Sequence, residues 1–374
     1  MLFKNARIFD GGRFYEGSFR CDGGRFTELY RDIPDGEGTD LAGAYVIPGL
    51  IDLHGHGNSG ADFSDGDYEG LVRMARFLAR NGVTSFAPAS MTLPYDDIGR
   101  AVATAVRLSR EQPEQSSRIA GIQMEGPFFS EKKKGAQNGA YLRLPDLEAF
   151  RRLCAESDGL LRIVDVAPEL DGAIDFIRGA SKLAKVSIAH TDASYEQTCA
   201  AIDAGASHLT HLFNAMPSIH HRDPGVIGAA AERESVTAEL ICDGLHVHES
   251  AVRIAFKLFP GRLCLISDAL RCCGMPDGVY ELGGQQARLS GKIARLPDGT
   301  IAGAASTLYD GMLNAISFGV PVAEAIRAAT LVPARELGRD KELGSISLGK
   351  YADFIVCGSA LDRRQVYIGG ERIQ

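Results

Sequence analysis

The chain lacks tryptophan, Cys-x-x-Cys pairs, an excess of positive charge and long hydrophobic runs. Its eight cysteines are scattered, which favours free, mostly buried thiols in a reducing cytoplasm over a disulfide framework. The net charge of -8 gives no electrostatic case for binding nucleic acid or an anionic membrane. No apolar run approaches the roughly 20 residues of a transmembrane helix, and no signal-peptide pattern opens the sequence. We therefore expect a cytoplasmic enzyme without nucleic-acid or membrane partners.

Helical and strand-like segments alternate through the long middle of the chain. Helical patterns cover 67–81, ending at Gly82, and 94–111. About eight strand-like runs fit the same rhythm: 51–53, 83–88, 119–124, 163–167, 186–190, 208–211, 237–241 and 263–267. This succession predicts an α/β fold, a (β/α)8 TIM-type barrel, with the active site at the C-terminal ends of its strands.

Both ends of the chain are rich in short strand-like runs and glycine turns. The N-terminal runs are 6–9 and 25–29, and the C-terminal runs are 353–357 and 365–368. We expect them to form one small β-sandwich domain. The predicted limits are 1–47 and 336–374 for this domain, and 48–335 for a metal-dependent catalytic barrel.

The most informative motif is the segment 48–56, an apolar run that ends in two histidines one residue apart. In a strand, residues i and i+2 point to the same side, so His54 and His56 can reach one metal ion. Imidazole is a strong ligand for zinc, iron and related metals. Chance His-x-His pairs are common, so the interpretation needs further ligands at other strand ends.

Such candidates stand where the predicted strands end. Glu125 follows one run and precedes Gly-Pro, while His190 and His211 end two successive runs. A lone residue of either kind is more often a surface or packed side chain, but together with His-x-His they favour a site for one or two divalent ions. Asp268, after the last run, either caps the next helix or exchanges a proton with bound water.

The remaining histidines and the vicinal cysteines carry weaker signals. His246 is a candidate for binding substrate or stabilising an oxyanion. We expect the others to be structural, packed or solvated: His208, His220, His221 and His248. The pair Cys272–Cys273 is either redox-sensitive, a spurious ligand or, as we favour, a structural part of a loop.

With these motifs, the chain resembles the N-acetylglucosamine-6-phosphate deacetylase family of the amidohydrolase superfamily, essentially from end to end. Motifs shared across the superfamily are 48–56 and the tail 344–353. Sharper, family-level motifs lie at 124–128, 133–136, 211–216, 243–247 and 267–269. The most specific is the string His-Leu-Phe-Asn-Ala-Met at 211–216.

The resemblance implies a ligand set for divalent metal, with zinc and iron as the candidates. Glu125, His190 and His211 would bind the primary ion. Some members of the family carry Gln and Asn at the first motif and hold one ion, whereas others carry His-x-His and can hold two. His54 and His56 therefore imply capacity for a second ion.

The implied reaction is hydrolysis of the acetamide of N-acetylglucosamine 6-phosphate to glucosamine 6-phosphate and acetate. Asp268 would accept the proton of the attacking water and deliver it to the departing amine. His246 would contact the substrate and help to hold the developing oxyanion.

The resemblance also implies residues that bind the sugar phosphate. Asn214, Ala215 and Arg222 match the family's positions, and the arginine would come from the neighbouring subunit of a homodimer. Its planar fork suits phosphate oxygens, although spacing alone fits a solvated loop equally well. Gln137, a further candidate substrate contact, stands where relatives often carry histidine; it can hydrogen-bond but cannot carry charge.

Three alternatives stay open. In the first, the substrate is another N-acetylated hexosamine phosphate, such as N-acetylgalactosamine 6-phosphate, which differs by one hydroxyl. In the second, the chain is a cyclic-amide hydrolase or aminoacylase, although these usually bring a lysine where this chain has Glu125. In the third, the chain is a catalytically silent scaffold, which the retention of Glu125, His190, His211 and Asp268 disfavours.

Overall fold

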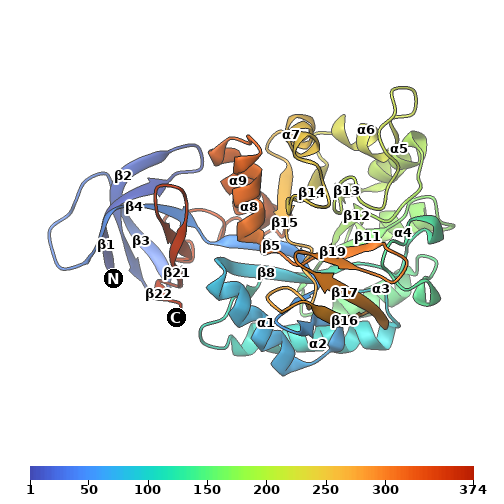
Figure 1. Ribbon diagram of the computed structural model, residues 1–374, viewed down its shortest axis with the longest axis horizontal. Coiled ribbons are helices and arrows are strands. Elements are labelled where there is room, and N and C mark those ends of the chain that lie inside the picture. The colour runs from blue at the N-terminus through green and yellow to red at the C-terminus, as the bar shows by residue number, and fades with distance from the viewer.

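The computed structural model describes residues 1–374 and has a large α/β part beside a smaller sheet (Figure 1). Eight parallel strands are joined in the order β15-β14-β13-β12-β11-β10-β8-β5. They are β5 (Leu50–Gly55), β8 (Val83–Ser90), β10 (Ile122–Met124), β11 (Leu161–Val166), β12 (Lys185–Ile188), β13 (Ala206–Leu209), β14 (Thr237–Ile241) and β15 (Leu263–Ile266). A short strand, β9 (Arg118–Ile119), also pairs with β8. The amide of Asp268 donates to the carbonyl of His54 at 3.0 Å, which brings the two ends of the sheet together. The predicted (β/α)8 barrel is confirmed.

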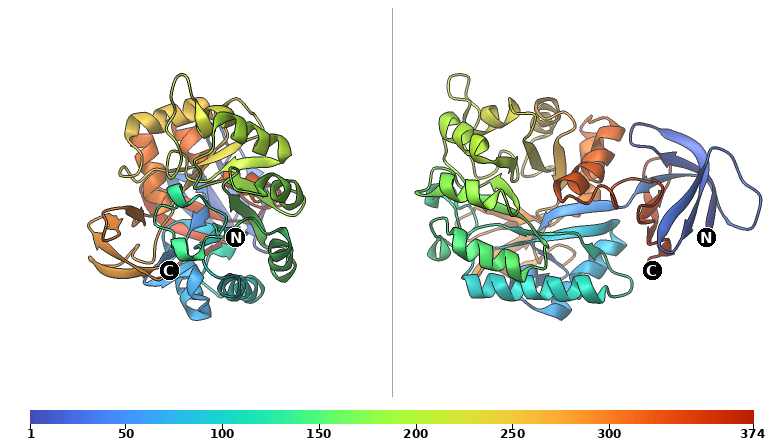
Figure 2. Two further views of the ribbon diagram at one scale, coloured as in Figure 1. Left: turned by 90° about the vertical axis from the view of Figure 1, so that its right-hand side faces the viewer. Right: turned by 180° about the vertical axis from the view of Figure 1, so that it is seen from behind.

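Helices surround the barrel strands (Figure 2). They are α1 (Tyr68–Arg80), α2 (Tyr95–Glu111), α3 (Leu147–Glu156), α4 (Ala173–Ala180), α5 (Tyr195–Ala204), α6 (Gly225–Ala231), α7 (Glu249–Leu258), α8 (Leu308–Ser317), α9 (Val322–Ala328) and α10 (Leu331–Glu336). Polar caps begin several of them; Asp67, for example, accepts the amides of Glu69 and Gly70 at the start of α1. After α1, Gly82 adopts a φ of +85°, which favours glycine, in the turn into β8. None of the helices is both long and apolar enough to span a bilayer.

The smaller sheet takes strands from both ends of the chain, in the order β22-β21-β20-β4-β1-β2-β3. These strands are β1 (Leu2–Phe9), β2 (Phe14–Asp22), β3 (Arg25–Tyr30), β4 (Thr39–Pro48), β20 (Phe354–Cys357), β21 (Arg363–Ile368) and β22 (Glu371–Arg372). Although β2 and β20 are three positions apart, about 14 Å in a flat sheet, the rings of Phe19 and Phe354 lie 4.9 Å apart. The sheet therefore curves over an aromatic core, as in a small sandwich. The domain limits given above stay a prediction.

An antiparallel sheet that the sequence did not lead us to expect is inserted between β15 and α8. Its strands are β16 (Gly278–Leu282), β17 (Gln285–Ser290), β18 (Ile293–Arg295) and β19 (Ile301–Ala304). The backbone of Ala304 donates to the carbonyl of Asp268 and accepts from the amide of Leu270, both at 3.0 Å. This insertion thus reaches the C-terminal end of the barrel.

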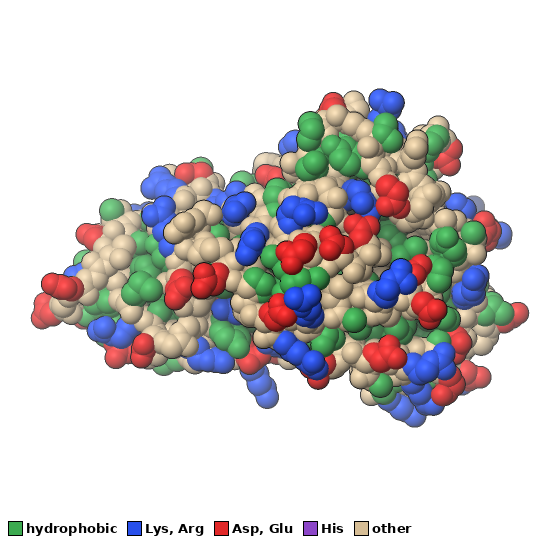
Figure 3. Space-filling model, turned by 90° about the horizontal axis from the view of Figure 1, so that it is seen from below, with side chains coloured by type: hydrophobic (Ala, Val, Ile, Leu, Met, Phe, Trp, Pro, Cys, Tyr) green, Lys and Arg blue, Asp and Glu red, His purple; other side chains and the backbone are tan.

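The remaining elements are short. Strands β6 (Gly57–Asn58) and β7 (Ala61–Asp62) form a two-stranded sheet, and three 3-10 turns cover η1 (Phe63–Asp65), η2 (Glu131–Lys133) and η3 (Gly139–Tyr141). On the face drawn in Figure 3, lysine and arginine are interspersed with aspartate and glutamate rather than gathered in one patch. The largest hydrophobic core, of 65 residues, fills the space between the barrel strands and the helices.

Candidate metal centre and active site

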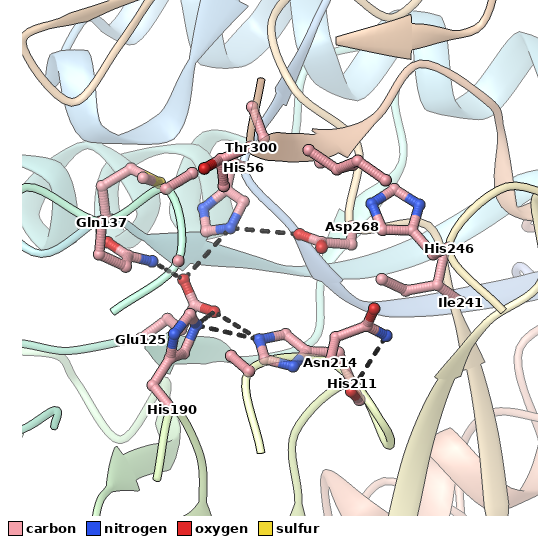
Figure 4. Close-up of a pocket in the computed structure, with 17 residues that line it drawn as sticks. His56, Glu125, Gln137, His190, His211, Asn214, Ile241, His246, Asp268 and Thr300 are labelled. Carbon is pink, nitrogen blue, oxygen red and sulfur yellow. Dashed lines mark hydrogen bonds and ion pairs between the residues drawn. The ribbon is translucent and has the colours of Figure 1, made fainter. Parts of the chain in front are cut away.

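Glu125, directly after β10, lies at the centre of a cluster of imidazoles (Figure 4). Its Oε1 is 3.2 Å from Nε2 of His190 and 3.1 Å from Nε2 of His211. Its Oε2 is 3.3 Å from Nε2 of His56. One buried carboxylate therefore faces two groups of histidines through its two oxygens.

Three residues of the cluster, each just after a strand, have an unusual backbone conformation. His190, His211 and Asp268 each stand two residues after a barrel strand, with φ of +44°, +30° and +46°. Left-handed conformations are costly for residues other than glycine and concentrate at functional sites. The prediction that strands extend through His190 and His211 is wrong for this reason: the backbone leaves the extended form at Ile188 and Leu209.

The geometry and charge of the cluster fit a divalent metal. Potential ligand atoms lie within 4.8 Å of one another in two groups, His54–His56–Glu125 and Glu125–His190–His211. Nε2 of His54 is buried without a hydrogen-bond partner, and Nε2 of His190 faces Nε2 of His211 at 3.1 Å. Imidazole nitrogens around a carboxylate form a donor set typical of zinc and iron. The two groups share Glu125, so the arrangement can hold one ion or two.

The electrostatics also favour positive charge at the centre. Burial would raise the pKa of Glu125, but its contacts with His190 and His211 hold that pKa well below its usual range. Burial would lower the pKa of His54, yet nearby carboxylates, Glu239 first, raise it well above the ordinary value. Carboxylates that stay ionised beside imidazoles that attract protons form a site to which a cation is suited.

Asp268 and His246 face the same cavity. Oδ1 of Asp268 is 3.4 Å from Nε2 of His56 and 3.7 Å from Nε2 of His54. Burial would raise the pKa of Asp268, but the hydrogen bond with His56 lowers it, so this carboxylate stays ionised. Nδ1 of His246 contacts Oδ2 of Asp243 at 2.7 Å, which leaves Nε2 for a ligand.

The cavity has a volume of about 210 Å³ and opens at the C-terminal ends of the strands. Asn214, Ala215 and Gln137 line it, and no lysine does. They share the lining with His56, Glu125, His190, His211, His246 and Asp268, and their contact with substrate stays a prediction. The absence of lysine from this lining removes support for the cyclic-amide hydrolase alternative. Segment 300–303, from the inserted sheet, also lines it.

The chain is similar to known proteins over most of its length. A sequence model of the Amidohydrolase family matches residues 45–373. The chain belongs to the amidohydrolase family. An N-acetylglucosamine-6-phosphate deacetylase of Bacillus subtilis is 38% identical over 85% of this chain and 82% of the relative, and one of Vibrio furnissii is 37% identical over 88% and 82%.

A solved structure gives the same result. A mutant of N-acetyl-D-glucosamine-6-phosphate deacetylase from Mycobacterium smegmatis, in complex with N-acetyl-D-glucosamine-6-phosphate, superposes with a TM-score of 0.94. It is 33% identical and covers 100% of this chain and 99% of its own. The resemblance inferred from the motifs is therefore confirmed over the whole of this chain.

Gln137 lies against Glu125, whereas Arg222 lies outside the cavity. The amide nitrogen of Gln137 donates to Oε2 of Glu125, and its oxygen accepts from the amide of Thr92 at 2.8 Å. Both polar ends of Gln137 are thus engaged, and its contact with substrate stays a prediction. Arg222 lies on an exposed loop, beside His221, and does not line the cavity.

The other histidines and the vicinal cysteines have structural contacts. His248 caps α7, and His220 and His221 are exposed. Burial raises the pKa of Cys272 to about 11 and that of Cys273 to about 12, which disfavours the thiolates needed for metal binding. This agrees with a structural role for the pair.

Sequence reasoning missed three contributors to the site. Asp243 orients His246, Glu239 contacts His54, and Thr300 reaches the cavity from the inserted sheet. Asp243 stands in the same short motif as His246, so their spacing offered a signal. The other two depend on pairing between distant segments and left no local signal.

The pH dependence of stability tests the buried contacts of His208. Burial would lower its pKa, but hydrogen bonds with Glu239 and Glu336 raise it to about 9. The pKa of His208 in the folded protein thus exceeds its value of about 6.5 in the unfolded chain. The hydrogen bonds of His208 therefore stabilise the fold fully below the unfolded pKa, and this stabilisation is lost as pH rises through the folded pKa. The difference in unfolding free energy between wild type and His208→Gln is thus larger near pH ~6 than near pH ~9.5. Urea unfolding at the two pH values measures it, and equal differences would contradict the prediction.

Proposed function

We propose that this amidohydrolase hydrolyses N-acetylglucosamine 6-phosphate to glucosamine 6-phosphate and acetate. The observation that carries the proposal is a Glu125 carboxylate shared by two histidine groups, with Asp268 beside it at the mouth of the barrel. The relatives from Vibrio furnissii and Bacillus subtilis bear this activity in their names. We further propose a cytoplasmic location, which suits eight free cysteines.

Divalent metal is the cofactor that this site suits. Glu125, His190 and His211 would hold the primary ion, and His54 and His56 would hold a second ion with Glu125. Zinc and iron both match mixed imidazole and carboxylate ligands. When bound, such an ion polarises a carbonyl group and lowers the pKa of water.

The chain's own residues complete the reaction. Asp268, kept ionised by its imidazole neighbours, accepts the proton of the attacking water and passes it to the amide nitrogen as the C–N bond breaks. His246, oriented by Asp243, donates a hydrogen bond from Nε2 to the carbonyl oxygen as negative charge develops there. Asn214 and Ala215 line the opening where the sugar phosphate would bind.

A second candidate substrate is N-acetylgalactosamine 6-phosphate. An N-acetylgalactosamine-6-phosphate deacetylase of Escherichia coli O157:H7 is 37% identical over 89% of this chain and 89% of the relative. The two sugars differ at one hydroxyl, so the same acetamide chemistry serves both. Comparing kcat/KM on the two substrates separates the candidates.

Acetate release by the metal-loaded protein tests the proposed function and the role of Asp268 together. Wild type should release one acetate per N-acetylglucosamine 6-phosphate consumed. Asp268→Asn should lower kcat by roughly 10² to 10⁴ because the proton acceptor is lost, while bound metal is retained. Absence of acetate from wild type would refute the activity, whereas near-wild-type kcat in the variant would refute only the role of Asp268.

A mixing experiment tests the proposed homodimer, in which Arg222 of the partner subunit binds the phosphate. Arg222→Ala and Asp268→Asn homodimers should each be nearly inactive at low substrate concentration. When equal amounts of the two variants are refolded together, about half of the dimers are mixed, and each mixed dimer has one complete site out of two. About a quarter of wild-type activity should therefore return. No recovery in dimers shown to be mixed would indicate that Arg222 does not act across the interface.

A further inference from the structure

A chain of charged side chains runs through the barrel interior below the candidate metal centre. Nδ1 of His54 lies 2.8 Å from Oε2 of Glu239, whose Oε1 lies 3.1 Å from Nε2 of His208. Nδ1 of His208 lies 3.0 Å from Oε2 of Glu336, which also pairs with Lys185 at 3.0 Å. His54, Glu239 and His208 are 0% exposed. Contacts of this kind in the dry interior hold each side chain in one orientation.

The contact with Glu239 decides which nitrogen of His54 faces the site. An imidazole that donates its Nδ1 proton to a carboxylate has its Nε2 lone pair free for a metal. Nε2 of His54 is 3.7 Å from both Oε1 of Glu125 and Oδ1 of Asp268, and it has no hydrogen-bond partner. Glu239 thus stands behind His54 on the side away from the ion.

The other three candidate ligands are held differently. Nδ1 of His56 contacts the carbonyl oxygen of Ala89 at 3.1 Å, and Nδ1 of His190 contacts that of Lys133 at 2.8 Å. Nδ1 of His211 has no partner. Among the four imidazoles, only His54 has its Nδ1 on a carboxylate.

We propose that Glu239 is a positioning residue that fixes the tautomer and orientation of His54, and that binding of the second metal ion depends on it. The inference rests on the proposed function, in which His54, His56 and Glu125 hold that ion. Glu239 is itself fixed from behind by His208, so its carboxylate cannot turn away. Loss of such outer partners weakens metal binding by about 10- to 100-fold.

If Glu239 contributed only to general stability, its loss would affect the two ions alike. Oε2 of Glu239 also accepts the backbone amide of His211 at 3.1 Å, so it touches both halves of the centre. The contact with His211 involves the backbone, whereas that with His54 involves the ligating ring. The positioning role therefore predicts an unequal loss, with the second ion affected and the first retained.

Two substitutions and a control test the proposal by equilibrium dialysis against buffered free zinc, with bound zinc counted per subunit. Glu239→Met removes the hydrogen bonds with His54, His208 and the backbone of His211 at similar volume, and Glu239→Gln keeps one acceptor while removing the charge. Asp165→Asn is the matched control: this buried carboxylate contacts Gln123 and Thr210 but none of the histidines. Thermal unfolding of each variant shows whether it is folded.

We expect wild type and Asp165→Asn to bind two zinc ions. Glu239→Met should keep the first and bind the second about 10- to 100-fold more weakly, with a smaller change in Glu239→Gln. Two ions bound with wild-type affinity in folded Glu239→Met, loss of both together in folded Glu239→Gln, or a single ion in wild type would each overturn the proposal. A wild type that binds two ions but releases no acetate would instead refute the proposed function alone.

Discussion

The site depends on one constraint: the buried carboxylate of Glu125 must be compensated by positive charge. Burying an ionised carboxylate costs several kcal/mol unless partners replace the water it loses. Here Oε1 contacts His190 and His211, and Oε2 contacts His56. Because the same carboxylate serves both groups, the two halves of the centre are coupled by geometry before any ion binds.

The barrel supplies the positions that this carboxylate requires. Its parallel strands end at one rim, and there the chain adopts left-handed conformations at His190, His211 and Asp268. Surrounding contacts hold Asp268 in place: its amide donates to the carbonyl of His54, and its carbonyl accepts from Ala304 in the inserted sheet. Rigid support of this kind is what allows a strained backbone to persist at a functional site.

Much of this arrangement could be predicted from the sequence, and the reason is periodicity. The alternation of helical and strand-like runs located the barrel, and chemistry-bearing residues at the ends of those runs located the cavity. The inserted sheet, 278–304, was missed because its strands lie outside the alternation of helix and strand that marks the barrel, and they carry no ligand motif. Glu239 was missed because it lies inside a strand rather than at its end, and because its partner, His54, is far away in sequence.

The measurement that tests the account most directly is metal binding by Glu125→Gln. If the carboxylate belongs to both halves, affinity for the first ion and for the second should fall together, in a protein that still unfolds cooperatively. If one half kept its wild-type affinity while the other was lost, the carboxylate would serve a single ion, and the account of a shared centre would be contradicted.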